Sequence, residues 1–140
     1  MFQPVARLLG RDFVYGPTDC YALVKDAYHL AGIELPEIIR GDIDDDAKLE
    51  RIPAGMEEHF FKISDIDFVE VGDVIVTALG GKASHMAIYI GEGRVLHHQY
   101  NQMSLRENLS EGWLKRIHSI WRHPDWKTEC FEALEQDFGW

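Results

Sequence analysis

The chain contains one stretch of clear helical periodicity, directly after Asp19. Apolar residues recur there every three or four positions, which places them on one face of a helix. The residues on that face are Cys20, Leu23, Val24, Ala27 and Ala31. Thr18 and Asp19 are good N-cap residues, and Gly32 is a typical stop. We therefore predict a helix over residues 20–31.

From residue 71 onward the apolar period changes from helical to alternating, which is typical of strands. The predicted strands are residues 74–79, 85–90, 94–100 and 116–122. A helix that precedes an antiparallel meander indicates an α+β fold, with the helix packed on the sheet. Weaker patterns predict short helices within residues 1–12 and 47–63, and another after Pro124. The apolar side of that last helix would carry Trp126, Cys130, Leu134 and Phe138.

Length and composition fit one domain over residues 1–140, with 46% hydrophobic residues to build a core. The formal net charge of -10 disfavours nucleic acid and anionic membranes as partners. We expect synthesis in the cytoplasm without a signal peptide, and no membrane insertion, because no apolar run is long enough. The two cysteines, Cys20 and Cys130, do not form a disulfide framework.

Cys20 is the candidate nucleophile. A thiol in the first helical turn feels the positive end of the helix dipole, which favours the reactive thiolate. The alternative is a small buried cysteine in the core. Tyr15 precedes a turn into this helix and is expected near the thiol, although it also fits a core aromatic with a wet hydroxyl.

A catalytic thiol needs an imidazole that accepts its proton and a third polar group that fixes the tautomer of this imidazole. His85 opens a predicted strand and is the candidate base. Either His97 or His98 lies on the same sheet face as His85, and the register of the hairpin between the two strands decides which one.

Two hairpin loops are compatible with the sequence between the two strands. A two-residue loop at Glu92-Gly93 would place His98 opposite Ala87, on the face of His85. A three-residue loop over residues 91–93, with Gly93 in the left-handed conformation, would place His97 there instead. Glycine at both ends of the sequence Gly-Glu-Gly favours the three-residue loop. We therefore predict that His97 is the third residue and that His98 points to the opposite face.

The spacing of the possible ligands disfavours two metal sites. Cys20, His85 and His97 would supply three zinc ligands, but the chain has no closely spaced ligand pair such as C-x-x-C or H-E-x-x-H. The acidic residues 42–46 suggest a calcium loop, yet Ala47 and Pro53 occupy the positions that need glycine and glutamate. We expect a solvated acidic loop there, and no metal or other cofactor.

The residues around Cys20 and His85 resemble the NlpC-type cysteine peptidases, a papain-like family that cleaves peptide stems of bacterial peptidoglycan. Residues 19–24, Asp-Cys-Tyr-Ala-Leu-Val, are similar to the family's D-C-S-G-L-V at the nucleophile. Residues 71–74 resemble its G-D-L strand start, and residues 85–91 its H-V-G-I-Y-L-G. The match covers about residues 13–101 and leaves residues 124–140 as a C-terminal extension.

The resemblance implies a papain-like fold and a role for each candidate residue. Cys20 would be the nucleophile, His85 the base, and His97, twelve positions later, the third member of the triad. Tyr15 corresponds to the family's tyrosine before the nucleophile and would help to bind the oxyanion, although the intervening loop is shorter here. Tyr21 and Ala22 replace Ser-Gly, so that Tyr21 would reshape the substrate cleft. Asp73 would be structural, as a turn residue.

Shorter matches resemble a subgroup, the phage tail assembly proteins of the lambda K type. They are Tyr-Gly-x-x-Asp-Cys, residues 95–98, and Trp-Leu-Lys-Arg-Ile before residues 121–123. They imply a tail-tip endopeptidase, delivered in the virion, that opens the wall for genome delivery. Its partners would be stem peptides and tail-tip proteins. The alternatives are a catalytically silent tail or wall-binding protein, and an acyltransferase, which the order of cysteine before histidine disfavours.

Overall fold

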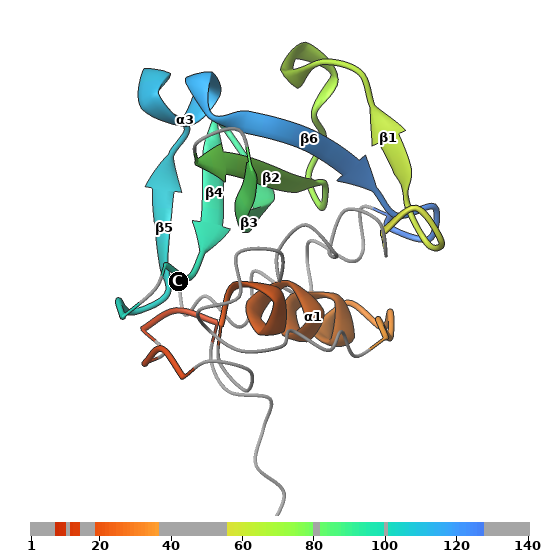
Figure 1. Ribbon diagram of the computed structural model, residues 1–140. Coiled ribbons are helices and arrows are strands. Elements are labelled where there is room, and N and C mark those ends of the chain that lie inside the picture. Colours follow the sequence, from red (N-terminus) through yellow and green to blue (C-terminus); the bar gives the residue numbers. More distant parts are fainter. Residues whose placement is uncertain are drawn as a thin grey trace, which may run out of the picture.

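A computed structural model describes residues 8–10, 12–14, 19–36, 56–79, 82–99 and 101–127 of the chain. Its elements are α1 (Cys20–Leu30), β1 (Phe61–Ile63), η1 (Ile66–Phe68), β2 (Val74–Leu79), β3 (Lys82–Gly91), β4 (Arg94–His97), β5 (Leu105–Asn108), α3 (Glu111–Lys115) and β6 (Ile117–Arg122). All strand pairs are antiparallel, in the order β1-β6-β2-β3-β4-β5. The helix α1 lies across one face of this sheet (Figure 1), and α3 contributes Trp113 to the cluster on the other face. The predicted α+β architecture is confirmed.

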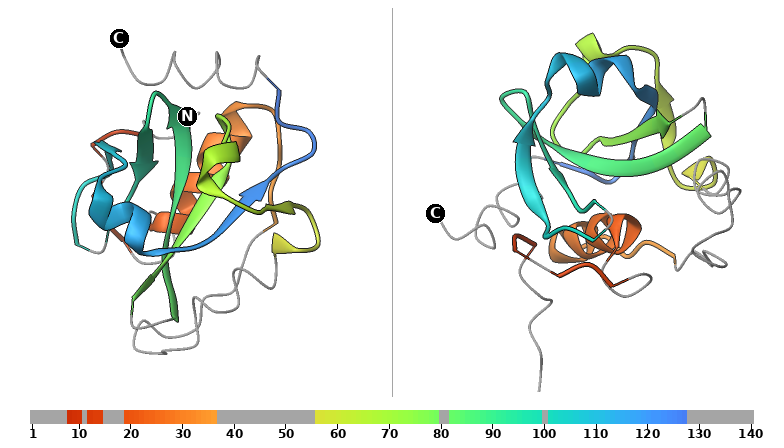
Figure 2. Two further views of the ribbon diagram at one scale, coloured as in Figure 1. Left: turned by 90° about the horizontal axis from the view of Figure 1, so that it is seen from above. Right: turned by 60° about the vertical axis from the view of Figure 1, so that its left-hand side comes forward.

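Alternating side chains of the sheet supply two hydrophobic clusters, one on each face. The first packs between α1 and the sheet and includes Leu23, Val24, Val74, Met86, Ile88, Leu96 and Trp121. The second lies on the other face and is made of Ile75, Ala87, Val95, Trp113 and Ile120. The strands of the sheet are strongly curved, as the two views in Figure 2 show. The central strands are therefore buried on both faces.

The helix α1 begins and ends where local chemistry predicts. Asp19 has extended backbone, and its Oδ1 accepts a hydrogen bond of 2.9 Å from the N–H of Ala22. This contact satisfies one of the N–H groups that a helix start leaves without intrahelical partners. At the other end Gly32 adopts a φ of +87°, which stops the helix. Cys20 is thus the first residue of the helix.

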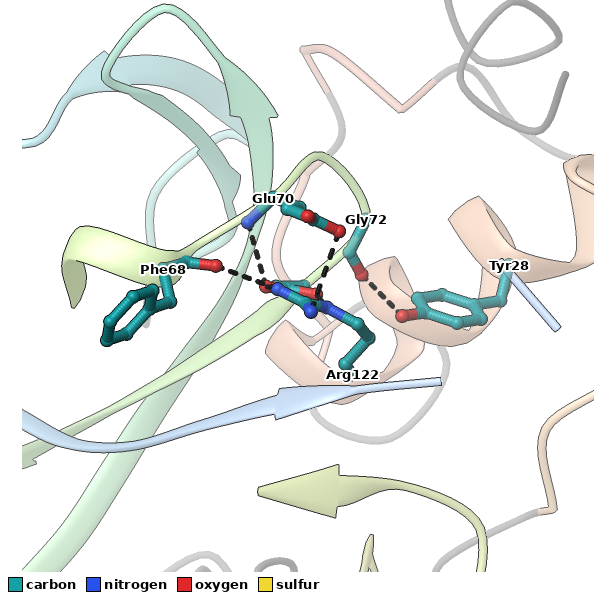
Figure 3. A network of polar contacts seen from close by, with 6 residues as sticks. Tyr28, Phe68, Glu70, Gly72 and Arg122 are labelled. Atoms are coloured by element: carbon teal, nitrogen blue, oxygen red, sulfur yellow. Dashed lines mark hydrogen bonds and ion pairs between the residues drawn. The ribbon is translucent and has the colours of Figure 1, made fainter. Parts of the chain in front are cut away.

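An ion pair fixes the start of β2 to the end of β6 (Figure 3). Asp73 is 1% exposed and accepts hydrogen bonds of 2.9 Å from both Nε and Nη2 of Arg122. Its Oδ2 also accepts from the N–H of Glu70, and Arg122 donates to the carbonyl of Phe68 at 2.8 Å. The burial of a carboxylate is tolerated because its oxygens are paired. The structural role predicted for Asp73 agrees with these contacts.

Tyr28 ties α1 to the turn before β2. Its side chain is fully buried, and its hydroxyl donates to the carbonyl oxygen of Gly72 (Figure 3). The Tyr28 ring also packs against the rings of Phe60, His123 and Trp126, with centroids 4.8–5.8 Å apart. The helix is therefore held by a polar anchor inside an aromatic cluster.

Several predicted boundaries were wrong. Residues 8–10 form bends, so the N-terminal helix is not present there, and residues 1–7 lie outside the described residues. Of the span 47–63, in which a short helix is expected, residues 47–55 lie outside the described residues. Met56 is helical, and Phe61–Ile63 pairs with the end of β6 as a strand. Strand β3 starts three residues early, and β4 stops at His97. The acidic residues 42–46 and the helix expected beyond residue 127 lie outside the described residues.

Four of the described elements were missed, namely β1, η1, β5 and α3. Three of the four residues of β5 are polar, and the strand is at the edge of the sheet, so no apolar alternation marks it. The short helix α3 is capped by Ser110, and it buries only Trp113. None of the described helices has the length and apolar character needed to cross a membrane.

A close approach at Gly72 predicts a strong effect of Gly72→Ala on stability. The residue has a φ of +95°, and a Cβ there would lie 2.2 Å from the Trp126 ring. Gly32 is a matched control, because its φ is +87° but a Cβ would meet no atom within 4 Å. We expect Gly32→Ala to cost about 1 kcal/mol from backbone strain alone, and Gly72→Ala to cost about 2 kcal/mol more.

Thermal or urea unfolding of both variants would measure this difference. Equal losses of stability would show that Trp126 does not pack against Gly72 as described.

Candidate active site

The hairpin of β3 and β4 has the register that was predicted but not the predicted loop. Ala87 lies opposite His97. The turn itself has two residues, Glu92 and Gly93, with φ of +54° and +69°, as a type I′ turn requires. The pairing shifts by one residue between Tyr89 and Gly91. This bulge, not a three-residue loop, brings His97 to the face of His85.

The structure brings His85 and His97 into direct contact. His85 Nε2 and His97 Nδ1 are 3.0 Å apart, a hydrogen-bond distance. The His97 side chain is 1% exposed, whereas that of His85 is partly exposed. Trp113 from α3 packs against both imidazoles, with ring centroids 5.0 Å from His97 and 6.1 Å from His85. One of the two imidazoles thus remains open to a reactant, while the other is enclosed.

Burial keeps both imidazoles neutral. Burial, together with the nearby His97, His98 and Arg116, lowers the pKa of His85 from 6.5 to about 3. Burial also lowers the pKa of His97, although the carboxylate of Glu107 opposes this shift. At neutral pH His85 therefore carries one proton and has one ring nitrogen available as an acceptor.

Glu107 is a residue of this site that the sequence did not reveal. Its Oε2 lies 2.7 Å from Nε2 of His97. The distance is that of an ion pair, but the ring N–H is not aligned with the oxygen as in a linear hydrogen bond. The available signal was Asn101, a residue type that tolerates the left-handed conformation and here has φ +57°. It marks a turn after β4, from which the chain returns as β5.

Cys20 lies at the start of the helix that packs against β3 and β4. The residue is 9% exposed and belongs to the cluster that contains Met86 and Leu96, the neighbours of the two histidines along each strand. Alternation turns Met86 and Leu96 toward α1 and turns His85 and His97 toward Trp113. The structure therefore joins the two imidazoles and places the thiol on an adjoining element. A reaction between Cys20 and His85 is part of the proposal below.

Of the two candidate tyrosines, Tyr21 is among the described residues and Tyr15 is not. Tyr21 is 4% exposed, and its hydroxyl donates to the carbonyl oxygen of Pro36. This contact connects α1 to the segment that follows it, and a role of Tyr21 at the substrate stays a prediction. Tyr15 lies outside the described residues, as does its predicted oxyanion role.

His98 takes no part in the imidazole pair. It is fully buried, and its ring meets the Phe13 ring edge-on at 5.3 Å. Within the described parts of the chain, no three cysteine, histidine or acidic side chains are arranged to hold a metal ion. The zinc site considered from Cys20, His85 and His97 is thus not formed by these three residues.

Solved structures share this fold. An NLP/P60 family protein from Staphylococcus aureus, described as similar to a lipoprotein, matches 85% of this chain with a TM-score of 0.59 and 22% sequence identity. An NlpC/P60 family protein from Bacillus cereus gives a TM-score of 0.60 with 18% identity over 86% of this chain. The chain spans 38% and 40% of those two proteins, about two fifths of their length.

Comparison with curated proteins identifies a nearer relative. The chain is 38% identical to the tail tip assembly protein K of Escherichia phage lambda, over 97% of this chain and 69% of that protein. The family model for NlpC/P60 matches residues 10–122, which include Cys20, both histidines and Glu107. The motifs, the fold and both comparisons agree, and the chain belongs to the NlpC/P60 family.

Proposed function

We propose that the protein is a cysteine endopeptidase that hydrolyses peptide stems of peptidoglycan as a component of a phage tail tip. The observation that carries this proposal is the contact of His85 Nε2 with His97 Nδ1, on two strands that pack against the helix starting at Cys20. An imidazole fixed through one nitrogen presents the other as a base, which is what thiol catalysis requires.

In the proposed reaction Cys20 attacks the carbonyl carbon of a stem-peptide amide. His85 is neutral and accepts the thiol proton at Nδ1, because Nε2 is engaged with His97. The protonated His85 then donates this proton to the leaving amine as the C–N bond breaks. Water hydrolyses the resulting thioester, with His85 again as the base, and the free thiol is restored.

Charge develops on the substrate oxygen during the attack and needs donors. The backbone N–H of Cys20 lies at the start of α1, where the helix dipole favours negative charge. Tyr15 would add its hydroxyl, and Tyr21 would limit the substrate cleft. His97 holds the orientation of His85 throughout.

The setting in a phage tail rests on the similarity to the tail tip assembly protein K. Tail proteins would be its partners, and the virion its place of action. There the enzyme would open the cell wall locally for genome delivery. The net charge of -10 is compatible with a wall substrate and disfavours binding to the genome itself.

A second function is a structural role in tail assembly without turnover. The similarity to the phage lambda tail tip assembly protein K favours it. In that case the contact between the two imidazoles would only stabilise the packing of β3 against β4. The two functions differ in whether Cys20 is needed.

Digestion of purified peptidoglycan tests the proposal. We expect the parent chain to release stem-peptide fragments, and Cys20→Ala to lower the rate about 10,000-fold, because the nucleophile is lost. Cys130→Ala is the matched control, since it removes the other cysteine, and it should leave the rate unchanged. Mass spectrometry of the released fragments would identify the bond that is cut.

A parent chain that releases no fragments, alone or with its tail partners, would contradict the peptidase. If Cys20→Ala also supports normal tail assembly, the structural role would then explain the protein. Equal loss of activity in Cys130→Ala would show that the assignment of Cys20 is wrong.

The low pKa of His85 predicts that acid destabilises the fold. The unfolded chain binds a proton at this residue below its ordinary pKa of 6.5, whereas the folded chain binds it only near pH 3. The stability from neutral His85 is thus present above pH 6.5 and is lost as the pH falls toward 3. We expect a loss on the order of 2 kcal/mol between about pH 7 and pH 4.5.

Unfolding midpoints of the parent and of His85→Gln, measured across this range, would check the prediction. The variant should lose less stability in acid. His97 and His123, whose pKa values burial also lowers, contribute to the loss that remains. The same acid loss in both proteins would contradict a neutral His85 in the folded chain.

A further inference from the structure

We propose that Glu107 is a positioning residue that fixes which ring nitrogens of His97 and His85 carry protons. This inference goes beyond the proposed peptidase function, and only its catalytic consequence rests on that function. It extends the pair of imidazoles to a chain of three groups, Glu107, His97 and His85, in which each one orients the next.

Sheet register places Glu107 beside His97. His97 of β4 lies opposite Leu105 of β5, and Val95 lies opposite Glu107. Residues two apart on a strand share a face, so Glu107 is a diagonal neighbour of His97 on the side of the imidazole pair. Its side chain is long enough to bring Oε2 to 2.7 Å from Nε2 of His97.

The two ends of this contact have different surroundings. The His97 side chain is 1% exposed, while that of Glu107 is 44% exposed. Exposure keeps the carboxylate of Glu107 in contact with water and so avoids a large desolvation cost, whereas enclosure shields His97 from competing water. A fixed negative charge therefore acts on one nitrogen of a buried ring.

The charge determines the position of each proton. A carboxylate beside Nε2 of His97 favours a proton there, which leaves Nδ1 bare as an acceptor. Nδ1 is 3.0 Å from Nε2 of His85, so that nitrogen must be the donor. His85 then carries its single proton on Nε2 and is bare at Nδ1. The bare nitrogen is the one that accepts the thiol proton in the proposed reaction.

Without the carboxylate, the protons of His97 and His85 would no longer be fixed on these ring nitrogens. His97 could then carry its proton on Nδ1 and donate to His85 Nε2, which would move the proton of His85 to Nδ1. In that tautomer His85 faces the thiol with an N–H and is not a base. Besides His97, the charged or titratable groups that lower the pKa of His85 are His98 and Arg116.

The ring nitrogens report the tautomers directly. We would label the full chain with ¹⁵N in a Cys20→Ala background, where no thiol can protonate His85, and record the imidazole nitrogens at neutral pH. Both His97 and His85 should be protonated at Nε2 and bare at Nδ1. In Glu107→Leu a fraction of His97 should carry its proton on Nδ1, and Glu107→Asp should restore part of the parent pattern.

The control is Glu57→Gln, which removes one negative charge from an exposed residue of another segment and should leave all four nitrogens unchanged. A parent protein with the His97 proton on Nδ1 would overturn the inference. So would unchanged tautomers in Glu107→Leu. The parent measurement needs no variant, so a variant that fails to fold does not prevent the test.

Activity gives the second readout, with Cys20 present. Glu107→Leu should lower kcat about tenfold or more and leave KM nearly unchanged, because a group that orients another ring acts on the reaction and not on substrate binding. Normal kcat in a variant with altered tautomers would refute the catalytic consequence. If the parent cleaves no peptidoglycan, the peptidase proposal fails, while the nitrogen pattern still decides the role of Glu107.

Discussion

The antiparallel register between β3 and β4 is the constraint on which the rest of the site depends. Side chains alternate across a sheet, so the pairing of Ala87 with His97 decides which imidazole shares a face with His85. The register is itself set by a bulge near Tyr89 together with a two-residue turn. The same alternation turns Met86 and Leu96 toward α1, so the imidazole pair and the apolar residues that pack against the helix come from neighbouring positions of two strands.

Asp73 and the imidazole pair of His85 and His97 are stabilised in opposite ways. The charge of the Asp73 carboxylate is paired, because Arg122 and the backbone N–H of Glu70 donate to its oxygens. His85 and His97 lose theirs, because burial favours the neutral ring. The first arrangement holds strand ends in place, which suits a structural group. The second leaves a nitrogen that can still accept a proton, which suits a reactive one.

Local patterns predicted the parts of the fold where one sequence feature dominates. The cap at Asp19 and the apolar spacing located α1, and β-branched residues located β2 at its observed bounds. The partner of His85 was also identified, although through a loop that does not form. Glu107 was out of reach, because β5 is a polar edge strand whose pairing with β4 depends on the sheet and not on its own residues.

Because His97 and His98 are consecutive, the length of the turn between β3 and β4 decides which histidine lies next to His85. The insertion or deletion of one residue in the turn would slip β4, and His98 would then replace His97 on the face of His85. An imidazole would still be supplied. Its neighbour on β5, however, would become Arg106, which holds the position relative to His98 that Glu107 holds relative to His97. Such a change in turn length would keep an imidazole next to His85 but replace the negative charge beside that imidazole with a positive one. The length of the turn and the charge of the neighbouring residue on β5 are therefore expected to be inherited together.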